Sequence, residues 1–265
     1  MAVKSGAIRK GGNVYMLEVK HLAVAVGDKE ILHDVNMTIQ NGETHVLFGP
    51  NGSGKTTLLA ALMGFPKYRV VRGSIMFHGQ DITNLSLDER ARLGIGMSFQ
   101  RPPVVRGVKT SDMVTACLGK GGGENAVAEL ARKTDLEGFL DREINYGFSG
   151  GELKRSEMMQ LLAQKPTLAL LDEPESGVDL ENIALIGELI NDLLDKHCPI
   201  LDRKCMGLII SHTGHILEYV NARTGYVMCD GRNTCHGDPH EILQVIKEYG
   251  YGECVKCMLR RRQDA

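Results

Sequence analysis

The sequence predicts an α/β fold whose core is a mostly parallel sheet covered by helices. Three apolar runs, at residues 45–48, 168–171 and 207–210, have the length and composition of strands buried on both faces. Within residues 181–196, isoleucine and leucine recur at three- and four-residue steps, the spacing of a helix that packs one face on such a sheet. Short apolar strands that alternate with amphipathic helices are typical of this class.

Two further regions differ from this core. Residues 17–24, 31–39 and 74–78 are rich in apolar and β-branched residues with turn signals between them, which predicts an N-terminal antiparallel β subdomain. From about residue 105 to 165 helical spacing replaces the strand pattern, and we expect a helical subdomain there. The expected organisation is a flexible tail at 1–15, one domain at 16–250 and a C-terminal tail at 251–265.

Composition excludes several classes of function. The chain has 265 residues, 43% of them apolar, so it can bury a large core without disulfides. Its 31 Lys and Arg against 33 Asp and Glu give no basic excess of the kind that binds nucleic acid. No apolar stretch is long enough to span a bilayer and no signal-peptide core is present, so we expect a cytoplasmic protein with reduced cysteines and no direct membrane insertion.

The segment from Gly49 to Thr57 reads GPNGSGKTT and fits the pattern G-x-x-x-x-G-K-[ST] between a buried strand and a helix at 56–63. Such a loop curls its backbone N–H groups around phosphates, with Lys55 on phosphate oxygens and the Thr56 hydroxyl on Mg²⁺. We therefore expect a P-loop NTPase that uses ATP and Mg²⁺. The candidate phosphate-binding residues are Gly49, Asn51, Gly52, Ser53, Gly54, Lys55, Thr56 and Thr57.

A phosphate loop requires a carboxylate to hold the metal, and residues 168–173, LALLDE, supply one at the end of a buried strand. Asp172 is the candidate metal residue, and Glu173 is the candidate for polarising the attacking water. Taken alone, an apolar strand ending in two acids is more often an ordinary strand exit. The assignment depends on the phosphate loop in the same chain.

Residues 148–152, FSGGE, resemble the signature segment of ABC ATPases, and the other marks of that family follow in order. Gln100, after an expected strand at 95–99, is similar to the Q-loop glutamine. Residues 176–179, SGVD, resemble the D-loop, and His212 resembles the switch histidine. The resemblance covers about residues 17–250.

This resemblance implies an ATPase that works as a head-to-tail homodimer. Each ATP would lie between one phosphate loop and the partner's signature residues Ser149, Gly150 and Gly151, with Asp179 near the seam. Gln100 would contact metal and water, and His212 would hold the γ-phosphate. The catalytic set is then Glu173, His212, Lys55 and Gln100, and the metal set is Thr56, Gln100 and Asp172.

ABC ATPases usually place an aromatic ring against adenine from the early antiparallel sheet. Residues 24–28, VAVGD, contain no such ring in this chain. We expect apolar contact from Val26 instead, with a weaker hold on the base.

Further segments resemble SufC, the ATPase of iron–sulfur cluster assembly. They are residues 64–70 (GFPKYRV), 89–95 (ERARLGI), 148–160 (FSGGELKRSEMMQ) and 248–252 (EYGYG). This resemblance implies a soluble SufB/SufD-like scaffold as partner. Two alternatives stay open: the nucleotide-binding subunit of a membrane ABC transporter, and a nucleotide-gated assembly protein with negligible turnover, which the presence of Glu173 disfavours.

Cys254 and Cys257 form a C-x-x-C pair near the C-terminus, and Cys229, Cys235, His236 and His240 precede them. These ligand types could hold zinc or an iron–sulfur cluster, or exchange a disulfide. The alternative is that the pair consists of unpaired thiols and that Cys229 belongs to the core of a hairpin.

Overall fold

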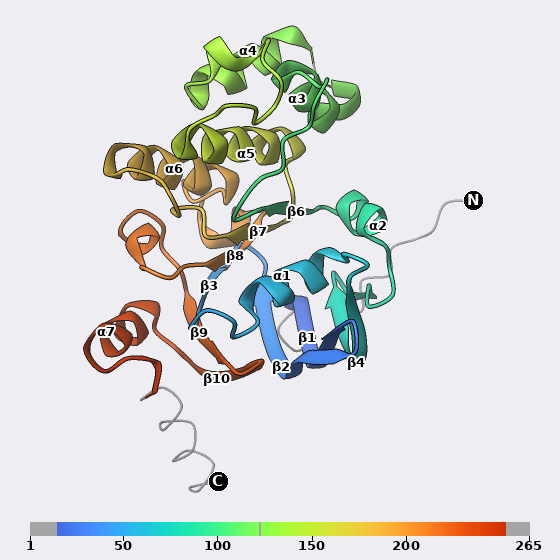
Figure 1. The fold of residues 1–265 in the computed structure, drawn as a ribbon, viewed down its shortest axis with the longest axis vertical. Helices are drawn as coiled ribbons and strands as arrows, with labels where there is room; N and C mark the ends of the chain where they lie inside the picture. Colours follow the sequence, from blue (N-terminus) through green and yellow to red (C-terminus); the bar gives the residue numbers. More distant parts are fainter. Residues whose placement is uncertain (1–14, 122, 253–265) are drawn as a thin grey trace, which may run out of the picture.

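The computed structural model describes residues 15–121 and 123–252, and it has the predicted α/β fold with a parallel core (Figure 1). A six-stranded sheet forms the centre. Its strands, in spatial order, are β10 (Arg232–Gly237), β9 (Thr224–Cys229), β3 (Thr44–Phe48), β8 (Met206–Ile210), β7 (Leu168–Asp172) and β6 (Ile95–Ser98). All neighbours are parallel except β10, which returns antiparallel to β9.

The three predicted central strands are confirmed, and every residue of β3, β7 and β8 is buried. Their parallel register brings their carboxyl ends to one edge of the sheet, where ligands bind in folds of this class. The phosphate loop follows β3, the acidic pair ends β7, and His212 follows β8 at this edge. The strand expected at 95–99 is β6 and ends one residue earlier, at Ser98.

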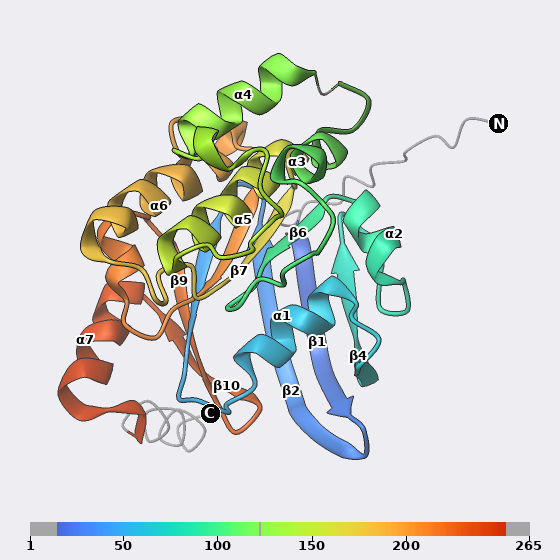
Figure 2. The same cartoon turned by 45° about the horizontal axis from the view of Figure 1, so that its top comes forward.

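The predicted antiparallel subdomain is a second sheet beside the first. Its strands, in spatial order, are β2 (Lys29–Gln40), β1 (Tyr15–Val26), β4 (Tyr68–Phe77) and β5 (Gln80–Asp81). Helix α1 (Lys55–Met63) packs between the two sheets, and Figure 2 shows it in front of β1 and β2. The apolar core of this layer combines side chains from both sheets and from α1, including Leu17, Leu32, Leu59 and Leu208.

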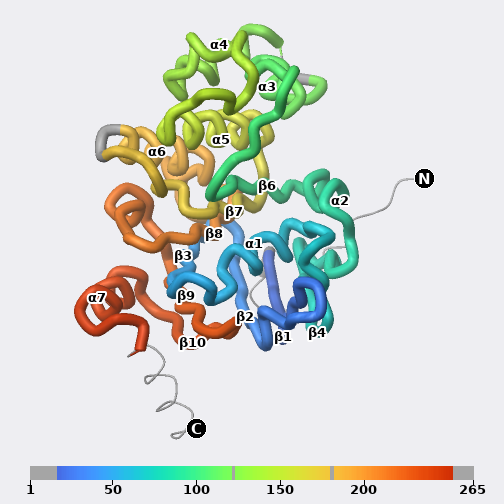
Figure 3. Tube along the Cα trace, viewed as in Figure 1, coloured from blue at the N-terminus to red at the C-terminus, as the bar shows by residue number. Residues whose placement is uncertain are grey.

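Helices fill the region where the strand pattern fades. They are α3 (Thr110–Leu118), η1 (Gly119–Gly121), α4 (Glu124–Lys133), η2 (Glu137–Phe139) and α5 (Gly150–Gln164). Together these helices form an arm, which we call the helical arm. Figure 3 traces the chain from the end of β6 into this arm and back through α5 to the central sheet. A small core of its own, with Val114, Val127 and Leu136, packs onto Met159 of α5.

The other face of the central sheet is covered by α5, α6 (Leu180–Leu193) and α7 (Pro239–Tyr249). The predicted helix at 181–196 is α6, with Ile186 and Ile190 fully buried against the sheet. The remaining elements are α2 (Leu87–Arg92), η3 (Ile200–Asp202) and η4 (His215–Glu218). Among the described residues, no helix has the length and apolar character needed to cross a bilayer.

Candidate functional site

A cavity of about 550 Å³ opens where the two sheets meet the phosphate loop. Residues from β1, β2, the phosphate loop, α1, β4 and the segments that follow β6, β7 and β8 converge on it. Its lining is Val26, Ile31, Asn51, Gly52, Gly54, Lys55, Thr56, Thr57, Lys67, Tyr68, Gln100, Glu173 and His212.

The conformation of the phosphate loop explains its glycines. Gly52 and Gly54 adopt φ of 78° and 104°, a left-handed region that favours glycine. A Cβ on Gly49 would lie 2.3 Å from the Met228 carbonyl oxygen, so only glycine fits against β9. The loop then opens directly into α1, whose first N–H groups lack partners within the helix and are suited to anions.

Lys55 is 5% exposed and folds over the loop that precedes it. Its Nζ donates to the carbonyl oxygens of Gly49 and Pro50 at 2.8 and 3.0 Å. Burial lowers the pKa of Lys55, while the neighbouring Glu173 and Asp172 oppose this shift. The loop carbonyls therefore hold the ammonium beside the cradle where phosphate oxygens bind.

Asp172 ends β7 behind the cavity and is 1% exposed. Burial raises its pKa, and a hydrogen bond with Thr56 opposes that effect. Among the described residues its Oδ1 has no hydrogen-bond partner. A buried carboxylate oxygen without a partner beside a threonine hydroxyl fits Mg²⁺, which prefers oxygen ligands and retains waters.

Both oxygens of Glu173 are engaged by residues from the neighbouring strand ends. Gln100 Nε2 donates to one at 2.8 Å, and His212 Nε2 lies 2.6 Å from the other. Glu173 has a φ of 51°, uncommon for a residue other than glycine, and its N–H donates to Ile210 of β8 at 3.2 Å. The structure thus brings Gln100 and His212, which are 112 positions apart in the chain, together around one carboxylate.

Two further residues of this region, Lys154 and Glu157 on α5, were not predicted. Lys154 Nζ donates to the carbonyls of Phe99 and Gln100 at 2.5 and 3.1 Å, and Glu157 accepts from the Phe99 N–H at 2.6 Å. Both side chains are buried, and burial raises the pKa of Glu157 to about 7 although Lys154 lies beside it. Helix α5 therefore holds the backbone that carries Gln100.

Glu175 is a third residue that the sequence did not single out. It is 7% exposed, and its carboxylate accepts a hydrogen bond from Ser211, whose Oγ accepts in turn from the Gly214 N–H at 2.9 Å. Burial raises the pKa of the Glu175 carboxyl. These contacts join the segment after β7 to the loop that carries His212.

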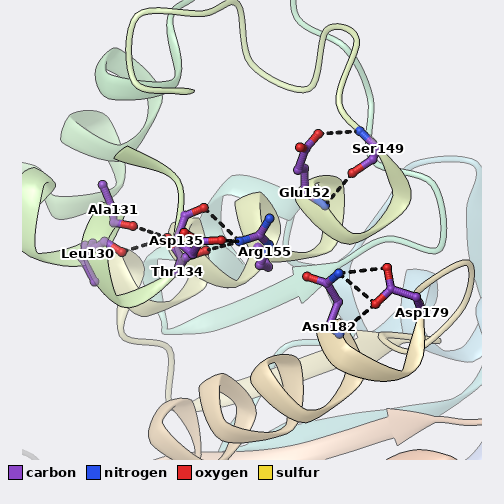
Figure 4. A network of polar contacts seen from close by, with 9 residues as sticks. All are labelled: Leu130, Ala131, Thr134, Asp135, Ser149, Glu152, Arg155, Asp179 and Asn182. Atoms are coloured by element: carbon purple, nitrogen blue, oxygen red, sulfur yellow. Dashed lines mark hydrogen bonds and ion pairs between the residues drawn. The ribbon is translucent and has the colours of Figure 1, made fainter. Parts of the chain in front are cut away.

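The signature residues lie at the start of α5 (Figure 4). Ser149 is the N-cap, and it exchanges hydrogen bonds with Glu152: the Ser149 N–H donates at 2.7 Å and the Glu152 N–H at 3.4 Å. A Cβ on Gly150 would lie 2.2 Å from the Gly177 carbonyl oxygen. The signature segment therefore packs against the segment expected to be the D-loop.

Asp179 caps α6 in the same region, accepting from the Asn182 N–H at 2.9 Å (Figure 4). A Cβ on Gly151 would lie 3.0 Å from the Asn182 side chain. Arg155 extends the contacts to the arm by donating to the carbonyls of Thr134 and Asp135. The helix starts of α5 and α6 thus lie side by side.

The structure divides the predicted site residues into two groups. Most of them line the cavity, and Gly49, Ser53 and Asp172 belong to the phosphate loop and the β7 end that supply lining residues without lining it themselves. Ser149, Gly150, Gly151 and Asp179 do not line it. One chain therefore presents a phosphate-loop surface and a separate helix-start surface.

The ABC transporter family profile matches residues 32–176, more than half of the chain. Curated relatives match over a greater length. A "probable ATP-dependent transporter ycf16" of Cyanidium caldarium is 36% identical, covering 89% of this chain and 95% of its own. The chain belongs to the ABC transporter ATPase family. "Vegetative protein 296" of Bacillus subtilis is also 36% identical, over 89% of this chain and 91% of its own.

Solved ABC cassettes have the same fold. A nucleotide-free ATP-binding cassette from an ABC transporter superposes with a TM-score of 0.74 at 23% identity, covering 91% of this chain and 98% of that one. A dimeric cassette bound to ADP and phosphate superposes with a TM-score of 0.71 at 20% identity, covering 84% and 98%.

This ABC ATPase binds ATP with Mg²⁺ and hydrolyses it. Cys254 and Cys257 lie outside the described residues. Cys229 is buried in β9, as expected for a core residue of the hairpin. Within residues 15–121 and 123–252, no cluster of three histidine, cysteine or acidic side chains is arranged to hold a metal ion.

Proposed function

We propose that this ATPase closes on a second copy of itself around ATP and thereby drives a conformational change in a soluble SufB/SufD-like scaffold during iron–sulfur cluster assembly. In this proposal, Lys55 and the loop amides bind the phosphates. Thr56, Asp172 and Gln100 hold Mg²⁺, which when bound neutralises charge that develops on the phosphate oxygens.

Glu173 polarises the attacking water, and His212 holds the γ-phosphate. To accept a proton from water, Glu173 releases one of the two contacts that Gln100 and His212 make with it. In this proposal Gln100 leaves Glu173 and contacts the metal and the attacking water when ATP is bound. The position of Gln100 therefore depends on the nucleotide at the site.

The second copy supplies Ser149, Gly150 and Gly151 at the start of α5, with Asp179 near the seam. A helix start is a favourable anion site, and Ser149 at this helix start is exposed and does not line this chain's own cavity. Two chains arranged head to tail complete two such sites.

The contacts of Lys154 and Glu157 with residues 99 and 100 carry the proposal. Both belong to the segment 148–160 that resembles SufC, and they join the signature helix to the Gln100 backbone. A groove of about 180 Å³ lies directly beside them. Its lining includes Met97, Phe99, Pro102, Val105 and Met113, which suits an apolar side chain of a partner protein.

A second candidate is the nucleotide-binding subunit of a membrane transporter. The names of the relatives favour it, because several of them contain the word transporter. The same groove would then receive a segment of a membrane-embedded subunit.

Affinity purification of the tagged chain from its own cells, under anaerobic conditions with ATP, tests the proposal. Recovery of a soluble, cluster-binding SufB-like protein supports it, and recovery of a polytopic membrane protein overturns it in favour of transport. Val105→Asp in the groove should abolish recovery of the partner. Val245→Asp, on the exposed side of α7, is the matched control and should leave it intact.

A further inference from the structure

The part of the nucleotide cavity away from the phosphate loop lies where β1 and β4 pair. Val26, the last residue of β1, is opposite Tyr68, the first residue of β4. Both line the cavity with Ile31 and Lys67. The same cavity is also lined by Lys55 and Thr56 of the phosphate loop, so the base of a nucleotide whose phosphates bind there has this part of the cavity available to it.

Tyr68 supplies a ring that the β1–β2 turn lacks. Among the described residues that line the cavity, it is the one with a phenyl or phenol ring. Neighbouring Phe65 does not line the cavity and packs edge-on against Phe99, with ring centroids 6.0 Å apart. The surface available to a flat base is therefore the Tyr68 ring together with the side chains of Val26 and Ile31.

The fold fixes the position of the Tyr68 ring. Its backbone N–H donates to the Phe65 carbonyl at 2.9 Å, and its half-buried side chain packs against the core between the two sheets. The Lys67 ammonium lies 5.9 Å from the ring centroid, which places a positive charge at the same part of the cavity. A ring held in this way loses little freedom when a base stacks on it.

We propose that Tyr68 is the stacking platform for the adenine of ATP and takes the place of the aromatic residue missing from residues 24–28. Val26 and Ile31 add apolar contact beside it. The inference concerns how the nucleotide is held and does not depend on which partner the ATPase drives.

Calorimetric binding of Mg-ATP and of inorganic tripolyphosphate to the full chain tests this. Stacking on an aromatic ring contributes enough that Tyr68→Ala should raise the Kd for ATP on the order of tenfold, while the Kd for tripolyphosphate stays unchanged. Tyr68→Phe keeps the ring and should bind ATP within about threefold of the wild type. Tyr249→Ala, on α7 and outside the cavity lining, is the matched control.

Two further variants separate stacking from a structural effect. Tyr68→Leu keeps apolar volume without a ring, so it should weaken ATP binding even if Tyr68→Ala fails to fold. The double variant Val26→Tyr/Tyr68→Leu places an aromatic ring in the β1–β2 turn and should restore the affinity for ATP. An unchanged Kd for ATP in Tyr68→Leu, or an equal loss for ATP and tripolyphosphate, overturns the proposal.

Discussion

At the scale of single residues, the most informative contact is the one that Glu173 makes with both Gln100 and His212. Each partner comes from a different strand end, so the parallel register of the sheet determines whether they meet. The carboxylate is thus placed by the fold, and its local conformation, with φ of 51°, is maintained by its backbone contact to β8.

Replacing this carboxylate should separate binding from turnover. In Glu173→Gln the amide cannot accept a proton from water, so hydrolysis should fall by at least about 100-fold. ATP should still bind at the phosphate loop, and an ATP-bound dimer should accumulate. Phosphate release and size-exclusion chromatography with ATP measure the two effects. Undiminished hydrolysis would contradict the role given to Glu173.

Glu157 should make stability depend on pH. Burial raises its folded pKa from 4.5 to about 7, so the folded chain binds this proton more tightly than the unfolded chain. The contribution of Glu157 to the free energy of unfolding is therefore fully present below pH 4.5 and is lost as the pH rises through about 7.

The unfolding free energy of the wild type relative to Glu157→Gln should accordingly fall between pH 4.5 and pH 8, by up to about 3 kcal/mol. Urea titrations of both chains at several pH values measure this difference. Glu129→Gln, on the exposed face of α4, controls for removal of one negative charge. If the difference in unfolding free energy between wild type and Glu157→Gln does not change with pH, the folded chain does not raise the pKa of Glu157.

At the scale of elements, helix α1 must keep its position, because the phosphate loop opens into its first turn. Arg90 of α2 secures the opposite end of α1 and is 2% exposed. Its guanidinium donates to the carbonyls of Ala61 and Leu62 at 2.7 and 2.8 Å, and to Thr83 and Leu85 at 2.9 and 3.0 Å. Ala61 and Leu62 lie in the last turn of α1, where helix carbonyls lack partners within the helix, and the Ala61 carbonyl also accepts from the Gly64 N–H at 3.2 Å.

Arg90→Ala should therefore destabilise the chain by about 3 kcal/mol, since it removes a buried side chain and its hydrogen bonds to four carbonyls, those of Leu62, Thr83 and Leu85 among them. Arg92→Ala, two positions along, removes a side chain that is 75% exposed and should cost less than about 0.5 kcal/mol. Denaturant unfolding of the two variants gives the comparison. Equal losses would mean that the carbonyl contacts of Arg90 contribute little.

The elements also show which features the sequence could predict. The buried strands β3, β7 and β8 and the phosphate loop are contiguous segments with strong local patterns, so their type and their common edge were predictable. Lys154 and Glu157 look like ordinary polar residues of a helix, because their partner segment lies 54 to 58 positions away. Tyr68 enters the cavity through the pairing of β4 with β1, which no local pattern specifies.

At the scale of the whole molecule, the predicted site residues fall on two surfaces. The phosphate loop and its acidic neighbours form one, and the helix starts at Ser149 and Asp179 form the other. Helix α5 connects the two surfaces, because it carries the signature segment at its start and contacts the Phe99 and Gln100 carbonyls through Lys154. Closure of two chains would thus act on Gln100 and on the groove beside it together.

Complementation between two inactive variants tests the shared site most directly. Lys55→Ala removes the phosphate-loop cation, and Ser149→Arg blocks the signature surface, so each homodimer should be inactive. A mixed dimer contains one site with an intact loop from one chain and an intact signature from the other. The mixture should therefore hydrolyse ATP faster than the sum of the two variants alone. Mixing Lys55→Ala with the double variant Lys55→Ala/Ser149→Arg should give no recovery, and absence of recovery in the first mixture would contradict the head-to-tail site.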